Sequence, residues 1–516
     1  MENNPFLPYN AKTYGDLLRP IDENSLVEGL LGYGLFGDKL PPIFTSEAFC
    51  TYIRSLPNPG SKGSRDWIRY RYIRNVGSFR EFGIPDPFAY AHLVFHLGAN
   101  WDNLKQYFWN VTKTHPYRAS RISIRKIAGK KQLFEMNYKN ALFDAEPLPA
   151  IAVGKRYRVR CDISRCFPSI YTHALEWALA GKDIAKKRKK GRAKKRSWEG
   201  LVDFYAQNTT NGETHGLLIG PHASNLLADI ILVKIDDELF KSRYDFIRHI
   251  DDFECYTDSF ERAESFPIEL EKCLAKYGLS INQKKTSICT LPDMQRDWTK
   301  QLSDYPVEGE KIKASVVEGF LNLAQACMKE SGNDAAVLNY ALKKLRKADL
   351  AYGAERYLAA VGAHLLYLYP YLLTLADSCI FSKSKMREDQ IAFVIRKVFK
   401  SSLFKRDYWS ANYCIYFSLK YKFDLDLPTK DEIKQTDDCL FMLFAWLYFD
   451  IRNDVSRKDE MKDIAKELYG ADDFDRFWIF VFEAFDKDDF DPNKKHTDWK
   501  GLKNKRVSFI DRSGLA

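Results

Sequence analysis

The sequence lacks any pair of cysteines in the Cys-x-x-Cys spacing, although it contains ten cysteines among 516 residues. Zinc fingers and zinc ribbons need such closely spaced thiols, so the spacing argues against those modules. We therefore expect reduced thiols that are mostly buried.

The sequence also lacks a leader and a clear membrane span. Met1 to Pro5 has neither a basic nor an apolar region, which predicts an intracellular, cytoplasmic protein without a secretory signal. Tyr357 to Ala376 runs twenty residues without a charge, long enough to cross a bilayer. It contains His364 and Pro370 and is flanked by charged helical segments, so it predicts two buried helices that meet at the proline.

The composition excludes a mainly disordered chain, because 45% of the residues are hydrophobic and 14% are aromatic. The length predicts two or three folded units. Residues 1–155 look like an α+β region, residues 156–298 combine strands with helices, and residues 299–516 show helical periodicity. The fold class expected is α+β followed by an all-α C-terminal domain.

The net charge of +10 is concentrated in one run, Lys182 to Arg196, where ten of fifteen residues are Lys or Arg. Such a run can track nucleic-acid phosphates, or it can be a solvated mobile loop. Both interpretations stay open. The candidate nucleic-acid contacts are Lys186, Lys187, Arg188, Lys189 and Lys190.

A second cationic feature is the strict alternation of Arg121-Ile122-Ser123-Ile124-Arg125. Alternation with period two predicts a strand. Its face with Arg121, Ser123 and Arg125 would be cationic, while the two isoleucines would face the core.

The strongest chemical signal is a set of three aspartates. Tyr157 to Ile163 looks like a strand that ends at Asp162, and Phe246 to Tyr256 is an apolar segment interrupted by Asp251 and Asp252. Carboxylates in such surroundings are costly unless cations neutralise them. Two Mg²⁺ ions held by carboxylates from separate strands are what in-line phosphoryl transfer requires, so this pattern predicts a two-metal site.

Two weaker signals accompany the aspartates. A loop bounded by Gly216 and Gly220 leads into an apolar helix, and its glycines would let the backbone approach a nucleotide or template. Downstream, Lys284 and Lys285 follow a strand-like turn, where a cation could meet a triphosphate or the leaving pyrophosphate.

The order of these motifs resembles the palm of reverse transcriptases. Asp162 and Phe167 match the first palm motif of that family, Gly216 to Ala228 the second, His249 to Asp252 the third, and Gly278 to Thr286 the fourth. The resemblance implies a right-hand polymerase with fingers and palm, in which residues 1–155 are fingers-like and residues 156–298 are the palm.

The resemblance also implies roles for individual residues. Asp162, Asp251 and Asp252 would bind two Mg²⁺ ions, or Mn²⁺ as the alternative, with the carbonyl of Ile163 as a further ligand. Phe167 would exclude a 2′-hydroxyl and so select deoxynucleoside triphosphates. The remaining implied nucleotide-binding residues are Arg121, Arg125, Lys126, Gly220, Ser224 and Lys285.

Departures from the usual motifs indicate which subgroup of reverse transcriptases the chain resembles. The third motif begins with His249 instead of an aromatic residue, and Ile219 stands where the second motif usually has Gln. Three features resemble bacterial abortive-infection and other defence-associated reverse transcriptases. They are the sequence of Leu218 to Ala228, the segment Ala174 to Lys182 and the helical C-terminus. We find no ribonuclease H acidic set, Cys-rich endonuclease or maturase-like basic tail, which disfavours a mobile-element enzyme.

The resemblance therefore implies an RNA-directed DNA polymerase of an antiphage system. Its partners would be an RNA template or non-coding RNA and the DNA product, with homo-oligomers such as trimers or hexamers, and no membrane. Two alternatives stay open. The same site could make DNA without a template or on a protein primer, or the chain could be a catalytically silent nucleic-acid-binding scaffold, against which the three intact aspartates argue.

Overall fold

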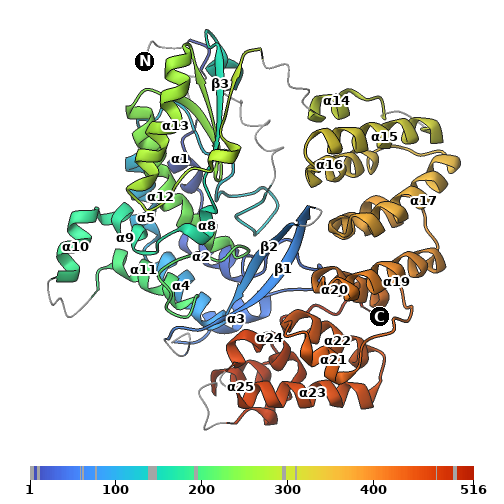
Figure 1. Cartoon of the computed structure of the whole chain (residues 1–516). Helices are drawn as coiled ribbons and strands as arrows, with labels where there is room; N and C mark the ends of the chain where they lie inside the picture. The colour runs from blue at the N-terminus through green and yellow to red at the C-terminus, as the bar shows by residue number, and fades with distance from the viewer. Residues whose placement is uncertain are drawn as a thin grey trace.

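The computed structural model describes most of the 516-residue chain (Figure 1). The residues described are 5–7, 12–57, 60, 63–75, 78–136, 148–190, 196–292, 298–307, 311–471, 473–491 and 497–515.

A four-stranded antiparallel sheet with the strand order β4-β5-β3-β6 forms the centre of the middle region. Buried residues such as Val159 and Cys161 alternate with the exposed Arg160 along β3, which is the pattern of a sheet with one covered face. The helix α13 packs on β3 and β5, and α12 packs against α13. The bounds are β3 Tyr157–Asp162, β4 Asp245–His249, β5 Asp252–Thr257, β6 Ser287–Thr290, α12 His222–Lys241 and α13 Phe260–Ala275.

The N-terminal region combines helices with one antiparallel hairpin, β1 (Trp67–Asn75) and β2 (Ser78–Pro85). Each of its longer helices buries an apolar face, and Asp86 caps α4 by accepting from the amides of Phe88 and Ala89. The helices are α1 Tyr14–Leu18, α2 Glu23–Val27, η1 Glu28–Gly32, α3 Glu47–Arg54, α4 Pro87–Ala99, α5 Trp101–Thr112 and α7 Leu148–Ala152.

The strand predicted for residues 121–125 is wrong. This segment forms no regular strand, and its link to the sheet is an isolated parallel bridge between Ser120 and Arg248. Arg121 and Ser123 are buried, as are the two isoleucines, so both sides of the segment are covered. The alternation therefore does not separate a cationic face from a core face.

Four helices connect β3 to α12. They are α8 Cys166–Ser169, α9 His173–Ala180, α10 Lys182–Lys190 and α11 Trp198–Asn208. Residues 182–190 of the basic run therefore form the helix α10, and Arg196 lies just before α11. Figure 1 shows that α10 projects from the edge of the molecule opposite the C-terminal helices.

All regular elements described after residue 298 are helices, which confirms the helical C-terminal region. The helix α17 ends at Leu368, and Pro370 begins the short turn η3, as expected for helices that meet at this proline. Among the described residues, no helix is long and apolar enough to cross a membrane. The helices are α14 Trp298–Asp304, α15 Ala314–Glu330, α16 Ala335–Leu345, α17 Tyr352–Leu368, η3 Pro370–Leu372, α18 Leu373–Leu375, η4 Ala376–Phe381, α19 Glu388–Phe404, α20 Tyr408–Lys420, α21 Lys430–Gln435, α22 Cys439–Ile451, α23 Val455–Gly470, α24 Phe474–Ala484, η5 Lys487–Asp489 and α25 Thr497–Asn504.

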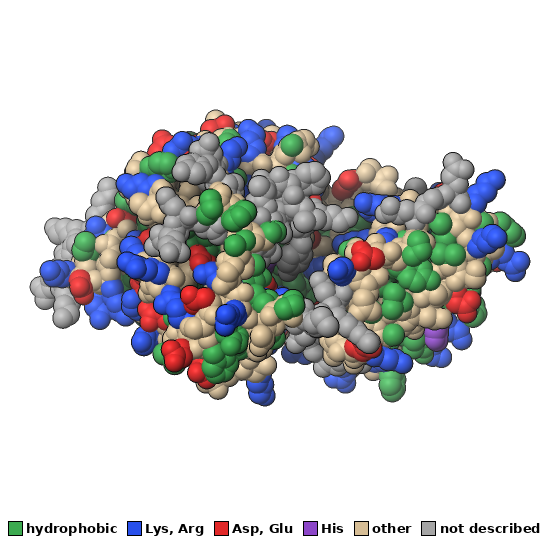
Figure 2. Space-filling view, turned by 90° about the horizontal axis from the view of Figure 1, so that it is seen from above, with side chains coloured by type: hydrophobic (Ala, Val, Ile, Leu, Met, Phe, Trp, Pro, Cys, Tyr) green, Lys and Arg blue, Asp and Glu red, His purple; other side chains and the backbone are tan. Residues whose placement is uncertain are grey.

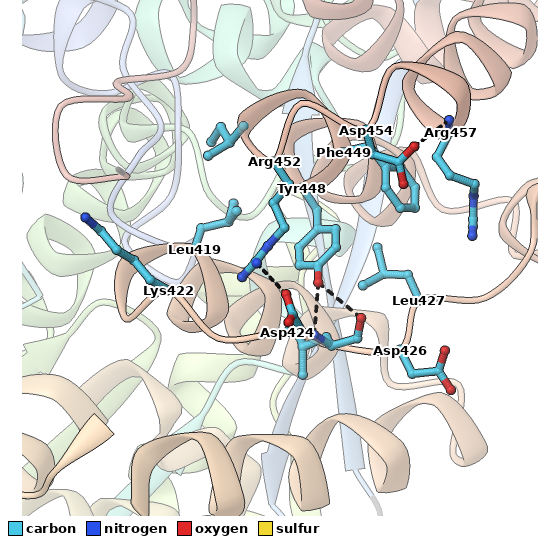
Figure 3. Close-up of a pocket in the computed structure, with 12 residues that line it drawn as sticks. Leu419, Lys422, Asp424, Asp426, Leu427, Tyr448, Phe449, Arg452, Asp454 and Arg457 are labelled. Atoms are coloured by element: carbon cyan, nitrogen blue, oxygen red, sulfur yellow. Dashed lines mark hydrogen bonds and ion pairs between the residues drawn. The ribbon is translucent and has the colours of Figure 1, made fainter. Parts of the chain in front are cut away.

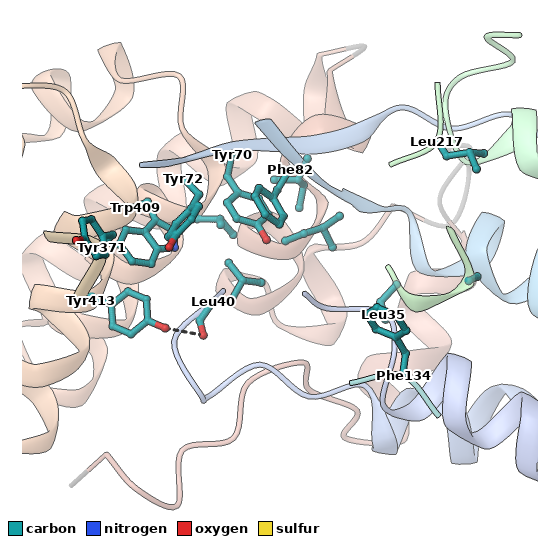
Figure 4. Close-up of a cluster of buried hydrophobic side chains, with 14 of the residues drawn as sticks. Leu35, Leu40, Tyr70, Tyr72, Phe82, Phe134, Leu217, Tyr371, Trp409 and Tyr413 are labelled. Carbon is teal, nitrogen blue, oxygen red and sulfur yellow. Dashed lines mark hydrogen bonds between the residues drawn. The ribbon is translucent and has the colours of Figure 1, made fainter. Parts of the chain in front are cut away.

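The C-terminal helices form an arc around the β1–β2 hairpin (Figure 1), and β1 contacts α20, α22, α24 and η3. Aromatic side chains fill this junction (Figure 4). The ring of Tyr72 lies edge-on to Trp409 with 4.8 Å between centroids, and the Tyr413 hydroxyl donates to the Leu40 carbonyl at 2.9 Å. The fingers-like hairpin and the helical region therefore share one core.

The end of the chain closes the same core. The amide of Thr45 donates to the carbonyl of Phe509, and the amide of Asp511 donates to the carbonyl of Ile43. The Phe509 ring packs on Phe49.

The cysteines are reduced, as expected. Nine of the ten are buried and Cys289 is partly exposed, and none forms a disulfide with another.

Candidate active site

The fold brings the three aspartates to one end of the sheet. Asp162, at the end of β3, lies directly opposite Asp252, the first residue of β5. Asp251 occupies the turn between β4 and β5, and its carbonyl accepts from the Ile163 amide at 3.0 Å. Residues ninety positions apart in sequence thus meet because β3 pairs with the hairpin.

The three carboxyl groups disturb one another. Burial, followed by the charge of Asp162, raises the pKa of Asp251, while Arg80 and Lys285 oppose this rise. Partial burial and then the charges of Asp251 and Asp162 raise the pKa of Asp252 to about 7, although its side chain still reaches solvent. The site therefore concentrates negative charge and favours a bound cation.

Protein groups supply the positive charge here. Asp162 accepts a hydrogen bond from Lys285 Nζ at 2.5 Å and another from Asn282 Nδ2 at 3.4 Å. Within the described parts of the chain, no group of three or more His, Cys, Asp or Glu side chains is assembled to hold a metal ion as it stands. Carboxylate oxygens are nevertheless the donors that hard divalent cations prefer, so the aspartates fit such an ion in their chemistry.

The backbone hydrogen bonds between Ile163 and the facing residue Ile281 are made by their neighbours in the chain. This antiparallel bridge uses the carbonyls of Asp162 and Ser280, which accept from the amides of Asn282 and Ser164. The fourth motif is thereby bonded directly to the first.

Phe167 lies on α8, four residues after Ile163, and its side chain is half-buried. Its carbonyl accepts from the Leu217 amide at 2.9 Å, which ties α8 to the Gly216 loop. Gly220 has φ +133°, and a Cβ there would lie 3.1 Å from the Gly83 carbonyl oxygen of β2. The close approach that Gly220 permits is therefore to the chain's own hairpin. Ser224 is buried in the first turn of α12.

Of the predicted cationic residues, Lys285 contacts Asp162, whereas the contacts we find for Arg121, Arg125 and Lys126 are with other residues. Arg121 is buried and close enough to His249 to lower its pKa, after the larger effect of burial. Arg125 donates to the Ser123 carbonyl at 3.1 Å, and the exposed Lys126 lies near Asp22. Sequence analysis missed Arg80 of β2, whose charge does reach Asp251.

The basic helix α10 lies apart from these residues. Lys186 and Lys187 are exposed, whereas Arg188 lies 3.1 Å from Glu199 and 3.7 Å from Glu176. Arg188 is therefore engaged in holding α10 to α9 and α11. The side chains of Lys189 and Lys190 and the following residues 191–195 lie outside the described residues.

Sequence analysis also missed Arg248, the residue before His249. Its side chain is completely buried and forms ion pairs with Asp236 and Asp229 of α12. A charged Arg248 within an apolar segment could have signalled a buried ion pair. Its partners, Asp229 and Asp236, lie on α12 after the end of the second motif and not beside it in the sequence.

A cavity of about 660 Å³ lies in the helical region (Figure 3). Its lining residues fall between 419 and 457, so it is separate from the aspartates. Arg452 points at Asp424 across it, and Asp454 caps the first turn of α23. Two of its charged groups thus already pair with each other, and we do not assign the cavity to the nucleotide.

Together, the antiparallel sheet with aspartates on β3 and on the β4–β5 turn defines a polymerase palm, the catalytic unit of a class of nucleotidyltransferases. The comparisons specify the class. Residues 129–318 match the family model "Reverse transcriptase (RNA-dependent DNA polymerase)". The chain therefore contains a reverse transcriptase domain and is a nucleotidyltransferase, and reverse transcriptases generally use divalent metal ions.

Solved telomerase structures resemble the chain only distantly. Apo telomerase from Candida tropicalis is 11% identical, with 76% of this chain and 70% of that chain covered and a TM-score of 0.33. Telomerases in complex with a TWJ fragment of telomeric RNA have TM-scores of 0.29, the one from Candida tropicalis at 11% identity covering 90% and 67% of the two chains, and the one from Candida albicans at 12% identity covering 68% and 67%. These scores are too low to support an argument. A comparison with curated proteins gives no match.

Proposed function

We propose that this protein is an RNA-directed DNA polymerase that adds deoxynucleotides by two-metal phosphoryl transfer at Asp162, Asp251 and Asp252. The observation that carries the proposal is the placement of Asp162 opposite Asp252, with Asp251 bonded through its carbonyl to the residue after Asp162. Among the residues that the structure describes, sheet pairing brings carboxylates from two palm motifs together at this place.

In the proposed reaction, a primer 3′-hydroxyl oxygen bonds to the α-phosphorus of the incoming triphosphate, the bond to the β-phosphate breaks, and the hydroxyl proton passes to water. Bound divalent cations, Mg²⁺ or Mn²⁺, would activate the hydroxyl and stabilise the pyrophosphate. The three aspartates would hold these ions, with the Ile163 carbonyl as a further donor. Phe167 would pack beneath the sugar, and Lys285 would meet the triphosphate.

The template and the biological role are also part of the proposal. The amino-acid sequence of Leu218 to Ala228 and the helical C-terminal region support a defence-associated enzyme that acts against phage with an associated non-coding RNA. The exposed Lys186 and Lys187 would bind phosphates of the nucleic acid. Figure 2 shows Lys and Arg side chains on both lobes of the molecule, which suits a polyanionic partner. Assembly into trimers or hexamers is proposed from the same resemblance.

The test is extension of oligo(dT) on poly(rA) with dTTP, with either Mg²⁺ or Mn²⁺. Asp251→Asn should lower incorporation by about 10³-fold or more, because removing a metal-binding carboxylate removes several kcal/mol of transition-state stabilisation. Asp258→Asn, the same change at an exposed position just after β5, should keep wild-type activity. Equal activity of the Asp251→Asn protein would overturn the proposal.

A further inference from the structure

Arg248 connects the aspartate-bearing turn to the interior of the protein. It is the largest charged side chain that is fully buried in the described core, with an exposed fraction of 0%. A buried guanidinium is costly unless its five donors find acceptors. The arrangement of those acceptors around Arg248 indicates what the residue does.

The guanidinium donates to three partners, namely Asp236, Asp229 and the Ile250 carbonyl. Nε and Nη2 bind the Asp236 carboxylate at 2.9 and 2.8 Å in a two-pronged contact. Nη1 reaches Asp229 Oδ1 at 3.3 Å and also donates to the Ile250 carbonyl at 2.9 Å. Asp229 is itself fixed, because the Tyr14 hydroxyl donates to its other oxygen at 2.8 Å.

The backbone of Arg248 is held as well. Its amide donates to the Ala119 carbonyl at 2.9 Å, and its carbonyl accepts from the Arg121 amide at 2.8 Å. The residue is therefore anchored by α12, by α1 through Tyr14 and Asp229, and by the extended segment 119–121. These anchors come from three separate parts of the chain.

The one contact that points away from this anchorage is the bond to the Ile250 carbonyl. Ile250 has φ +59°, a left-handed conformation that is strained for a β-branched residue. The peptide after Ile250 leads directly into Asp251. A strained turn persists only when its surroundings hold it, and the Arg248 guanidinium is the buried group that holds this carbonyl.

We propose that Arg248 is a positioning residue, which ties the Ile250 carbonyl to the Asp236–Asp229 pair and thereby fixes the turn that places Asp251 beside the end of β3. The inference rests on the proposed role of Asp251. An arginine is required because its planar guanidinium carries donors that can reach Asp236, Asp229 and the Ile250 carbonyl at the same time. A lysine would keep the charge but cannot bind Asp236 with two prongs and also reach Ile250.

The test compares Arg248→Lys with Tyr14→Phe. Both remove hydrogen bonds from the same buried network, but only the first removes the bond to the turn. For dTTP incorporation on poly(rA)·oligo(dT), Arg248→Lys should lower kcat by about 10- to 100-fold with KM within about threefold of wild type. Tyr14→Phe should stay within about threefold of wild type in both quantities.

A second measurement separates positioning from loss of fold. Mn²⁺ binding, followed by electron paramagnetic resonance without nucleotide, should weaken about tenfold in Arg248→Lys and remain unchanged in Tyr14→Phe. Should Arg248→Lys not fold, Asp236→Asn takes its place and should give the same pattern, since the guanidinium loses its two-pronged grip.

Wild-type kcat and Mn²⁺ affinity per folded molecule in Arg248→Lys would overturn the inference. The two proposals can fail separately. An inactive Asp251→Asn protein with a fully active Arg248→Lys protein would refute positioning alone, whereas an active Asp251→Asn protein would refute the proposed function.

Discussion

Lys285 Nζ lies 2.5 Å from Asp162 Oδ2, so the lysine of the fourth palm motif forms an ion pair with the aspartate of the first. About half of the Lys285 side chain is exposed, and η2 (Gln283–Lys285) carries it at the edge of the sheet. The ammonium therefore neutralises part of the charge for which a divalent cation would compete, and it can leave Asp162 to meet a phosphate.

This competition predicts opposite effects of one substitution. Lys285→Ala should strengthen Mn²⁺ binding by a few-fold, on the order expected for removing one nearby charge in a solvated site. The same protein should incorporate dTTP about 10- to 100-fold more slowly, because the triphosphate loses its cation. Lys284→Ala, at the exposed neighbouring position, serves as the control and should change neither quantity. Weaker Mn²⁺ binding in Lys285→Ala would contradict the competition.

Phe167 should determine the choice of sugar. Phe167→Ala should lower the preference for dTTP over UTP by about 10- to 100-fold, because the ring no longer occupies the space of a 2′-hydroxyl. The measurement is the ratio of kcat/KM values for the two triphosphates. Phe204→Ala on α11, also at a half-buried position, should lower thermal stability without changing this ratio. An unchanged ratio in Phe167→Ala would assign Phe167 to core packing.

Asp86 should make stability depend on pH. Burial raises its pKa from the ordinary 3.8 to about 6, so between these values the folded protein binds a proton that the unfolded chain has released. The free energy of unfolding contributed by Asp86 therefore falls as pH rises from 4 to 6, by up to about 3 kcal/mol. Asp86→Asn keeps an acceptor for the α4 amides and should flatten this part of the stability curve, measured by urea unfolding. Parallel curves for the two proteins would refute the prediction.

The two kinds of basic residue on α10 should behave differently. The double variant Lys186→Ala and Lys187→Ala should bind single-stranded RNA with a weaker salt dependence. The slope of log K against log salt concentration should fall in magnitude by about 1.4, since each phosphate contact contributes about 0.7. Thermal stability should stay unchanged, because both side chains are exposed. Arg188→Ala should instead lower the melting temperature, because the ion pair with the buried Glu176 would be lost. An unchanged salt slope in the double variant would make the lysines solvated surface residues.

The three aspartates that the sequence analysis grouped together do lie at one end of the sheet, and their signal in the sequence is local. Each lies at the end of an apolar segment, and strand pairing then brings Asp162 and Asp252 into register. The motifs also predicted the strands of the sheet and the Gly216 loop, and the helical periodicity after residue 298 predicted the helical C-terminal region. The roles assigned to Phe167, Gly220 and Ser224 remain proposals that the geometry permits but does not test.

What escaped prediction depends on contacts between distant segments. The alternation at residues 121–125 predicted a strand, but both faces are covered because this segment lies beside β4. Arg248 appeared as one cation in an apolar strand, and only packing against α12 provides its partners. The charge run at 182–196 suggested a loop as readily as an arm, but Glu176 and Glu199 neutralise Arg188 and allow a helix.

The contacts of β1 have a mechanical consequence. Since β1 packs on α20, α22, α24 and η3, and Phe509 packs on Phe49, the hairpin is joined to the helical arc through one packed core. Gly220, in contrast, is the close contact between that hairpin and the palm loop. A tilt of β2 about Gly220 toward the aspartates would swing the whole arc as a lever.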